Sequence, residues 1–309
     1  MNQYKTGPWL VVVAAMLWAV DAPFRKFLTA DLRSTTIVLM EHLVIAVLVV
    51  IFLFRYLPEL RKLRHFEWWA VVFIGLGGSA LATVMFTQSF HYLNPSVAIL
   101  LQKVQPFIAI LLAVWLLREK LGKTFWLWAL LGVFGAYLVS FPDFKIGSVA
   151  GSPNALGVLL ALGAAFFWGG STVMGRVVLS RVSFQAMTAV RFLSALLFLV
   201  LIELFTGRIS EVAGASPKDW LYVLIIAVVA GFVSLFIYYR GLTHTKASVA
   251  TLGELAFPVA AVIVNWKFLG AALEPTQIVG GLILLAATIG LSYFNAASSW
   301  EYEAKEIPV

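Results

Sequence analysis

Long apolar runs separated by short polar links dominate the chain. Each run has about 20 residues, enough for an α-helix to cross the hydrocarbon core of a bilayer. The apolar residues are continuous rather than alternating, so they do not fit the strands of a membrane β-barrel. The pattern predicts an all-α polytopic membrane protein with ten transmembrane helices. The predicted spans are Pro8–Leu28, Ser34–Phe54, Trp68–Phe90, Pro95–Leu117, Thr124–Phe141, Asn154–Val178, Ser183–Phe205, Trp220–Tyr239, Lys246–Leu269 and Pro275–Asn295.

Composition narrows the class of protein further. Of the 309 residues, 61% are hydrophobic and 12% are charged, whereas soluble domains are about 45–50% apolar and about 25% charged. A water-soluble globule must solvate its own surface and could not hide so much apolar area. A soluble enzyme, a nucleic-acid-binding module and a disordered chain are therefore excluded. The absence of cysteine also excludes disulfides and sulfur-ligated metal sites.

The distribution of basic residues predicts the orientation, because Lys and Arg accumulate on cytoplasmic loops. Thirteen Lys and Arg residues lie on the side of the N-terminus, and seven, Arg25 among them, lie on the other side. The net charge of +7 is therefore interpreted as the excess of Lys and Arg on the cytoplasmic loops, and not as a sign of nucleic-acid binding. We expect a multi-pass protein of the inner (plasma) membrane with both termini in the cytoplasm.

The two halves of the chain share a repeated sequence pattern. The tripeptide Ser-Val-Ala at 96–98 recurs at 248–250, and Pro106 matches Pro258 at the same offset of 152 residues. Near this offset, Trp18 matches Trp168. Five spans thus repeat as five, and an odd number of crossings inverts the second copy, as in many secondary transporters. The predicted units are a five-helix repeat at 1–147, a second, inverted repeat at 148–297 and a polar tail at 298–309.

Two stretches carry a resemblance to a known family. They are LREKL at 117–121, after the proline-containing fourth span, and SVATLGELAFPVAAVIV at 248–264. Together with ten spans in two halves, they resemble the EamA branch of the drug/metabolite transporter superfamily over nearly the whole chain. The resemblance implies an inner-membrane permease that exports amino acids or other metabolites. The second half has Gly-Ala-Ala-Leu at 270–273 where the first has Arg-Glu-Lys-Leu, so the repeat is not symmetric in charge there.

Six charged or histidine residues lie in the interior of the predicted spans, away from their ends, where charges are costly and usually face a cavity or a partner. A helical rise of about 1.5 Å per residue predicts two charged layers that flank a midplane chamber. We expect Lys103 to pair with Glu41 or Asp21, and Arg191 to pair with Glu254. Such pairs either bind substrate and gate its access, or join helices without a direct role. The outer layer contains Asp21, Glu41, His42 and Lys103, and the inner layer contains Arg191 and Glu254.

Prolines and tryptophans within the spans suggest where such a chamber could lie. A helical proline removes a backbone donor and clashes with the carbonyl four residues earlier, which for Pro106 belongs to Gln102. The freed carbonyls can line a cavity, and a fixed packing kink is the alternative. Trp18 and Trp168 lie at mid-depth, where an indole N–H needs a partner unless the ring is packed in lipid or core. The predicted hinges are Pro23, Pro106 and Pro258.

These residues together suggest a transporter. Aromatic rings bind planar groups and ammonium ions, and nearby acids and bases favour a zwitterionic substrate. We expect a secondary transporter that exports amino acids or similar small metabolites by alternating access. The alternative is a non-transporting membrane scaffold, sensor or accessory subunit. The substrate-binding or gating candidates are Trp18, Asp21, Glu41, His42, Gln102, Lys103, Trp168, Arg191 and Glu254.

Catalytic patterns are absent from the sequence. The four histidines show no H-E-x-x-H spacing, and neither a P-loop nor a G-x-S-x-G motif occurs. We expect no enzyme activity, cofactor or metal site, and no ATP-driven pumping. Asp21, Glu41 or His42 could carry a coupling proton, and facilitated diffusion is the alternative. The expected partners are a small-molecule substrate and the lipid bilayer but no nucleic acid, for a chain that is a monomer or a homodimer.

Overall fold

The computed structural model describes residues 3–117, 124–144, 153–242 and 253–303, and these residues form helices and turns without a β-strand. Six helical segments are long and apolar enough to cross a membrane, and further apolar helices are shorter. The expected class, an all-α polytopic membrane protein, is confirmed. The number of ten crossings and their inversion remain predictions. The six segments are Gly7–Asp31, Ser34–Ile51, His65–Ser89, Pro95–Leu116, Asn154–Leu179 and Gln185–Phe205.

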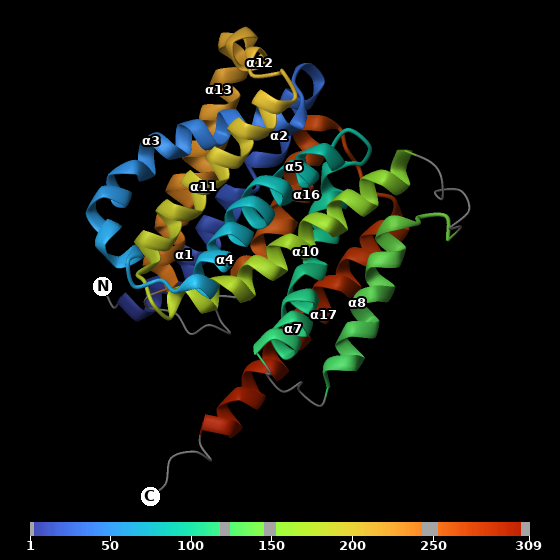
Figure 1. Cartoon of the computed structure of the whole chain (residues 1–309). Helices are drawn as coiled ribbons and strands as arrows, with labels where there is room; N and C mark the ends of the chain where they lie inside the picture. The colour runs from blue at the N-terminus through green and yellow to red at the C-terminus, as the bar shows by residue number, and fades with distance from the viewer. Residues whose placement is uncertain (1–2, 118–123, 145–152, 243–252, 304–309) are drawn as a thin grey trace, which may run out of the picture.

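The helices pack obliquely into one bundle (Figure 1). In this view the start of α1 lies at the left, and the end of α17 extends toward the bottom. The first half of the chain contains α1 (Gln3–Trp18), α2 (Asp21–Asp31), α3 (Ser34–Leu60), α4 (His65–Val72), η1 (Phe73–Leu81), α5 (Ala82–Ser89), α6 (Pro95–Leu101), η2 (Gln102–Val104), α7 (Gln105–Leu117) and α8 (Phe125–Ser140). The second half contains α10 (Pro153–Leu179), α11 (Phe184–Phe205), α12 (Ser210–Gly214), α13 (Pro217–Ile225), η3 (Ile226–Val233), α14 (Ser234–Leu242), α16 (Ala256–Leu269) and α17 (Pro275–Glu303).

Local sequence explains where several helices begin. Asn94 precedes α6, and its side chain accepts a hydrogen bond of 2.9 Å from the backbone N–H of Ser96. Ser216 and Asp219 form a reciprocal capping box at the start of α13. Both caps satisfy N–H groups that have no partner inside the helix. Prolines at the first helical position of both helices add a fixed φ that suits a helix start.

The helices are interrupted near the three predicted hinge prolines. Ala19 and Val20 form a turn between α1 and α2, and their N–H groups bond to carbonyls three residues back. Pro23 follows on α2 and cannot donate to the carbonyl of Ala19, which favours this break. The short 3₁₀ segment η2 likewise precedes Pro106, and α16 begins two residues before Pro258. The bends are therefore present, whereas movement about them remains a prediction.

Two π-helical segments occupy matching places in the predicted repeats. η1 begins at Phe73 and η3 begins at Ile226, and the two segments are 9 and 8 residues long. Long π-helices are rare, and π-bulges often mark functional sites. The sequence analysis did not predict them. Their matched positions are consistent with the repeated sequence pattern.

The C-terminal tail is partly helical. The tail predicted from residue 298 continues as helix to Glu303, because Ala, Ser, Glu, Trp and Tyr tolerate a helix and no Gly or Pro interrupts it before Pro308. The rest of that tail, the LREKL sequence after Leu117 and the predicted boundary at 147 lie outside the described residues.

A buried carboxylate on α11 lacks any visible partner in the described part of the chain. Glu203 is fully buried, and neither carboxylate oxygen has a hydrogen-bond partner there. An unsatisfied buried polar group costs about 1–3 kcal/mol. We therefore expect Glu203→Leu to raise the melting temperature of the purified protein in detergent. Glu211, which accepts hydrogen bonds from Thr36 and from the backbone N–H of Arg33, is the matched control. Glu211→Leu should lower the melting temperature, and equal losses in both variants would contradict the prediction.

Candidate functional site

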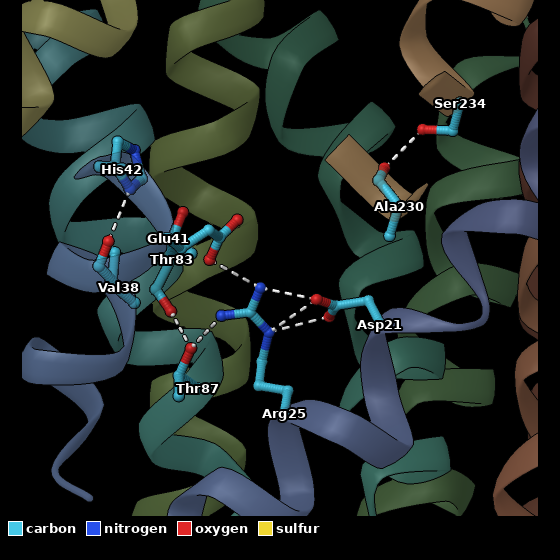
Figure 2. A network of polar contacts seen from close by, with 9 residues as sticks. All are labelled: Asp21, Arg25, Val38, Glu41, His42, Thr83, Thr87, Ala230 and Ser234. Carbon is cyan, nitrogen blue, oxygen red and sulfur yellow. Dashed lines mark hydrogen bonds and ion pairs between the residues drawn. The ribbon is translucent and has the colours of Figure 1, made fainter. Parts of the chain in front are cut away.

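A buried ion-pair network joins three helices of the first half (Figure 2). Nε of Arg25 donates to Asp21 Oδ2 at 2.8 Å, and Nη2 donates to Oδ1 of the same carboxylate at 2.7 Å. Nη2 also donates to Oε2 of Glu41 at 2.9 Å, and Nη1 donates to the hydroxyl of Thr87 at 2.9 Å. The Thr87 hydroxyl in turn donates to the carbonyl of Thr83. We call Asp21, Arg25, Glu41 and Thr87 the Arg25 network.

The chain brings these groups together from successive spans. Asp21 and Arg25 lie four residues apart on α2 and therefore face the same side of that helix, while Glu41 comes from α3 and Thr87 from α5. The side chain of Arg25 is only 4% exposed, compared with 19% for Asp21 and 12% for Glu41. The guanidinium thus holds α2, α3 and α5 together at the end of the bundle where α2 ends.

His42 lies next to this network on α3. Its Nδ1 is 2.8 Å from the carbonyl oxygen of Val38, and its Nε2 has no hydrogen-bond partner among the described residues. The ring centroid is 5.7 Å from that of Phe192. Arg191 of α11 donates from Nε to the hydroxyl of Ser79 at 2.6 Å, and its charge also acts on His42. Arg191, expected in the inner layer, thus lies within electrostatic range of His42, which we expected in the outer layer.

An aromatic cluster from both halves forms the second part of the site. The ring centroid of Trp18, at the end of α1, is 5.4 Å from that of Tyr238 on α14 and 6.2 Å from that of Phe257 on α16. The ammonium of Lys103, in η2, lies 5.0 Å from the centroid of the Phe257 ring. The hydroxyl of Tyr238 donates to the carboxylate of Glu254, which also attracts Lys103. We call these five residues the aromatic cluster.

A buried group of apolar side chains lies directly beside the aromatic cluster. It includes Phe86, Phe90, Val97 and Leu101, and Phe257 and Trp168 pack against it. The ring centroids of Phe86 and Trp168 are 5.2 Å apart. We call this group the apolar plug. Gln102, the residue after Leu101, has a buried side-chain oxygen without a partner among the described residues.

Two expected features of the site were wrong. Lys103 was expected to pair with Glu41 or Asp21, but Arg25 binds both carboxylates. Lys103 instead lies near Glu254, although depth arithmetic placed these two in different layers. The arithmetic fails because long side chains extend several ångströms along the bundle and because η2 interrupts the fourth span.

Arg25 itself was absent from the candidate residues, because the orientation argument counted it among the charges of the outer side. The signal in the sequence was its position four residues after Asp21, since i, i+4 pairs of opposite charge attract on one helix face. Removing Arg25 from the outer count leaves six basic residues there against thirteen, which strengthens the predicted orientation without testing it.

Comparison with known proteins relates this arrangement to transporters. The EamA-like transporter family matches the chain twice, over residues 5–141 and 155–293. The riboflavin transporter ImpX of Fusobacterium nucleatum subsp. nucleatum is 31% identical over 96% of this chain and 100% of its own length. The uncharacterized transporter YetK of Bacillus subtilis is 27% identical over 69% of this chain and 63% of its own length. A solved crystal structure with 17% identity has a TM-score of 0.59 over 93% of this chain and 95% of that chain, which shows a shared fold. The chain belongs to the EamA-like transporter family, and it is a membrane transporter rather than an enzyme.

Proposed function

We propose that this protein is a secondary transporter for a planar heteroaromatic solute of the riboflavin kind. One observation carries the proposal. The aromatic cluster combines three rings with Lys103 and Glu254, in a chain that is 31% identical to a riboflavin transporter along that relative's whole length. Aromatic side chains bind planar rings by stacking or edge contacts. A carboxylate and an ammonium beside them can hydrogen-bond to the polar edge of such a ring system.

The same contacts argue against the amino-acid substrate that the sequence suggested. A free zwitterion needs an anion and a cation that are both available to it. Asp21 and Glu41 already bind Arg25, and Glu254 already accepts from Tyr238 and attracts Lys103. Binding of a neutral planar solute would break fewer of these charge pairs, because the solute would displace contacts between rings rather than ion pairs.

Alternating access between two inverted five-helix repeats is the mechanism that we propose. The double match to the family model and the two π-helical segments near the same repeat offset support it. The helix interruptions before Pro106 and Pro258 would give matched bend points on the two sides of the site. We further propose that both termini face the cytoplasm and that the protein lies in the plasma membrane. Tags on the two ends that became accessible on opposite sides would contradict this topology.

Flux through reconstituted vesicles tests the function. Proteoliposomes should take up riboflavin faster than protein-free liposomes, and unlabelled riboflavin should compete whereas leucine should not. An imposed pH gradient would change the rate if Asp21, Glu41 or His42 carries a coupling proton, and leave it unchanged for facilitated diffusion. Trp18→Ala should reduce uptake strongly, while Trp115→Ala, at a side chain that is 76% exposed on the outside of the bundle, should not. Competition by leucine would favour the amino-acid alternative, and absence of any flux would favour a scaffold or sensor.

A further inference from the structure

A cavity of about 610 Å³ lies at the end of the bundle where α2 ends. Its walls come from α2, from the link between α5 and α6, and from the end of α16, and they include Lys26, His91, Asn94 and Phe268. Ligand pockets for small molecules are commonly about 300–1,000 Å³. We call this cavity the vestibule. It has the size for one planar solute with a polar side chain, and it is separate from the aromatic cluster.

The apolar plug separates the vestibule from the aromatic cluster. Leu93, in the wall of the vestibule, packs against the plug from one side. Phe257 of the aromatic cluster packs against the same plug. The ammonium of Lys26 donates to the backbone carbonyl of Phe90, a plug residue, so a vestibule side chain is bonded to the plug directly. A solute that moves between the two sites must displace these apolar contacts.

The walls of the vestibule combine rings with polar groups. The ring centroids of His91 and Tyr92 are 6.4 Å apart, and Phe268, 68% exposed, lines the same vestibule. The side-chain amide of Asn94 donates to the carbonyl of Ala272 at 2.9 Å, which fixes the link to the chain after α16. Burial lowers the pKa of His91, and the neighbouring Lys26 charge lowers it further. Both effects favour the neutral imidazole, which suits an uncharged aromatic solute.

We propose that the vestibule is a second binding site for the transported solute, which a planar heteroaromatic ring occupies while the apolar plug is closed. The ring would lie between Phe268 and the His91–Tyr92 pair, and its polar chain would bond to Asn94 or Lys26. This inference rests on the proposed function, because the ligand class is that of the transported solute. It adds a site outside the aromatic cluster and a reason for the plug between them.

The absence of cysteine gives a direct test. Ala271→Cys, a small substitution in the wall of the vestibule, introduces the single thiol of the chain, and its rate of reaction with a maleimide in detergent solution reports access to the vestibule. Riboflavin at ten times its Kd should slow labelling about tenfold, because a bound site is shielded in proportion to its occupancy. His65→Cys, at the start of α4 and remote from the vestibule lining, is the matched control, and its labelling should not change with riboflavin.

A second variant separates this inference from the proposed function. In Ala271→Cys combined with Lys103→Met, protection should persist, because the vestibule binds the solute independently of the aromatic cluster. Loss of protection in this double variant would overturn the inference, since closure caused by the other site would then explain the shielding. If calorimetry detects riboflavin binding but riboflavin does not protect the thiol, the vestibule inference is wrong. The transporter proposal would remain intact. No binding by either method would contradict both.

Discussion

Replacing Arg25 with alanine should leave little folded protein. The substitution removes the guanidinium that donates to Asp21, Glu41 and Thr87 and leaves two carboxylates facing each other in the bundle interior. Breaking a buried ion pair by removal of one partner costs about 3–5 kcal/mol, and the bilayer offers no water to replace the lost bonds. The measurements are the yield of monodisperse protein and its melting temperature in detergent. Arg33→Ala, at an exposed arginine near the same end, is the control and should behave as the wild type.

Variants of the two carboxylates sharpen this prediction. Asp21 accepts three hydrogen bonds from Arg25, at 2.7–3.1 Å, whereas Glu41 accepts one. Asp21→Asn should therefore lower the melting temperature more than Glu41→Gln does. Combining Arg25→Ala with both amide substitutions removes all of the charges, and this triple variant should recover much of the lost yield. If it stays as poor as Arg25→Ala alone, the loss comes from packing and the charge argument is wrong.

The distribution of hydrophobic residues was sufficient to predict the fold class. An apolar run of about 20 residues has few alternatives to a membrane helix, and the predicted fourth span begins at Pro95, where α6 begins. Helix starts at Pro95 and Pro275 were predictable because the preference for proline at the first helical position is local. The π-helical segments were not, since no local residue preference distinguishes them from α-helix.

The site was predictable in composition but not in pairing. Asp21, Glu41, Lys103 and Glu254 stood out because charges are rare inside apolar spans, and the structure places each of them in the Arg25 network or the aromatic cluster. Which cation meets which carboxylate depends on helix rotation, on interruptions such as η2, and on side-chain length. None of these can be calculated from depth alone, so the expected partner of Lys103 was wrong.

Lys103→Met should weaken riboflavin binding about 10- to 100-fold, because a hydrogen bond to a charged group contributes about 1.5–3 kcal/mol and each 1.4 kcal/mol is tenfold in Kd. Methionine keeps the length of the side chain beside Phe257 but removes the ammonium that lies 5.0 Å from its ring centroid. Titration by calorimetry or by quenching of flavin fluorescence measures the change. Lys218→Met is the matched control, because its ammonium lies 5.5 Å from the ring centroid of Tyr222 in the first turns of α13, outside the aromatic cluster.

Lys103 could affect binding by contacting the solute or only by stabilising the fold. A second substitution distinguishes these two roles. Lys103→Met leaves the carboxylate of Glu254 with Tyr238 but without its neighbouring cation, so some loss of stability is expected on either view. Adding Glu254→Gln removes that uncompensated charge and should restore the melting temperature. If Lys103 contacts the solute, binding stays weak in the double variant although the fold has recovered. If affinity returns together with stability, Lys103 acts only by neutralising Glu254, and the aromatic rings alone would have to recognise the solute.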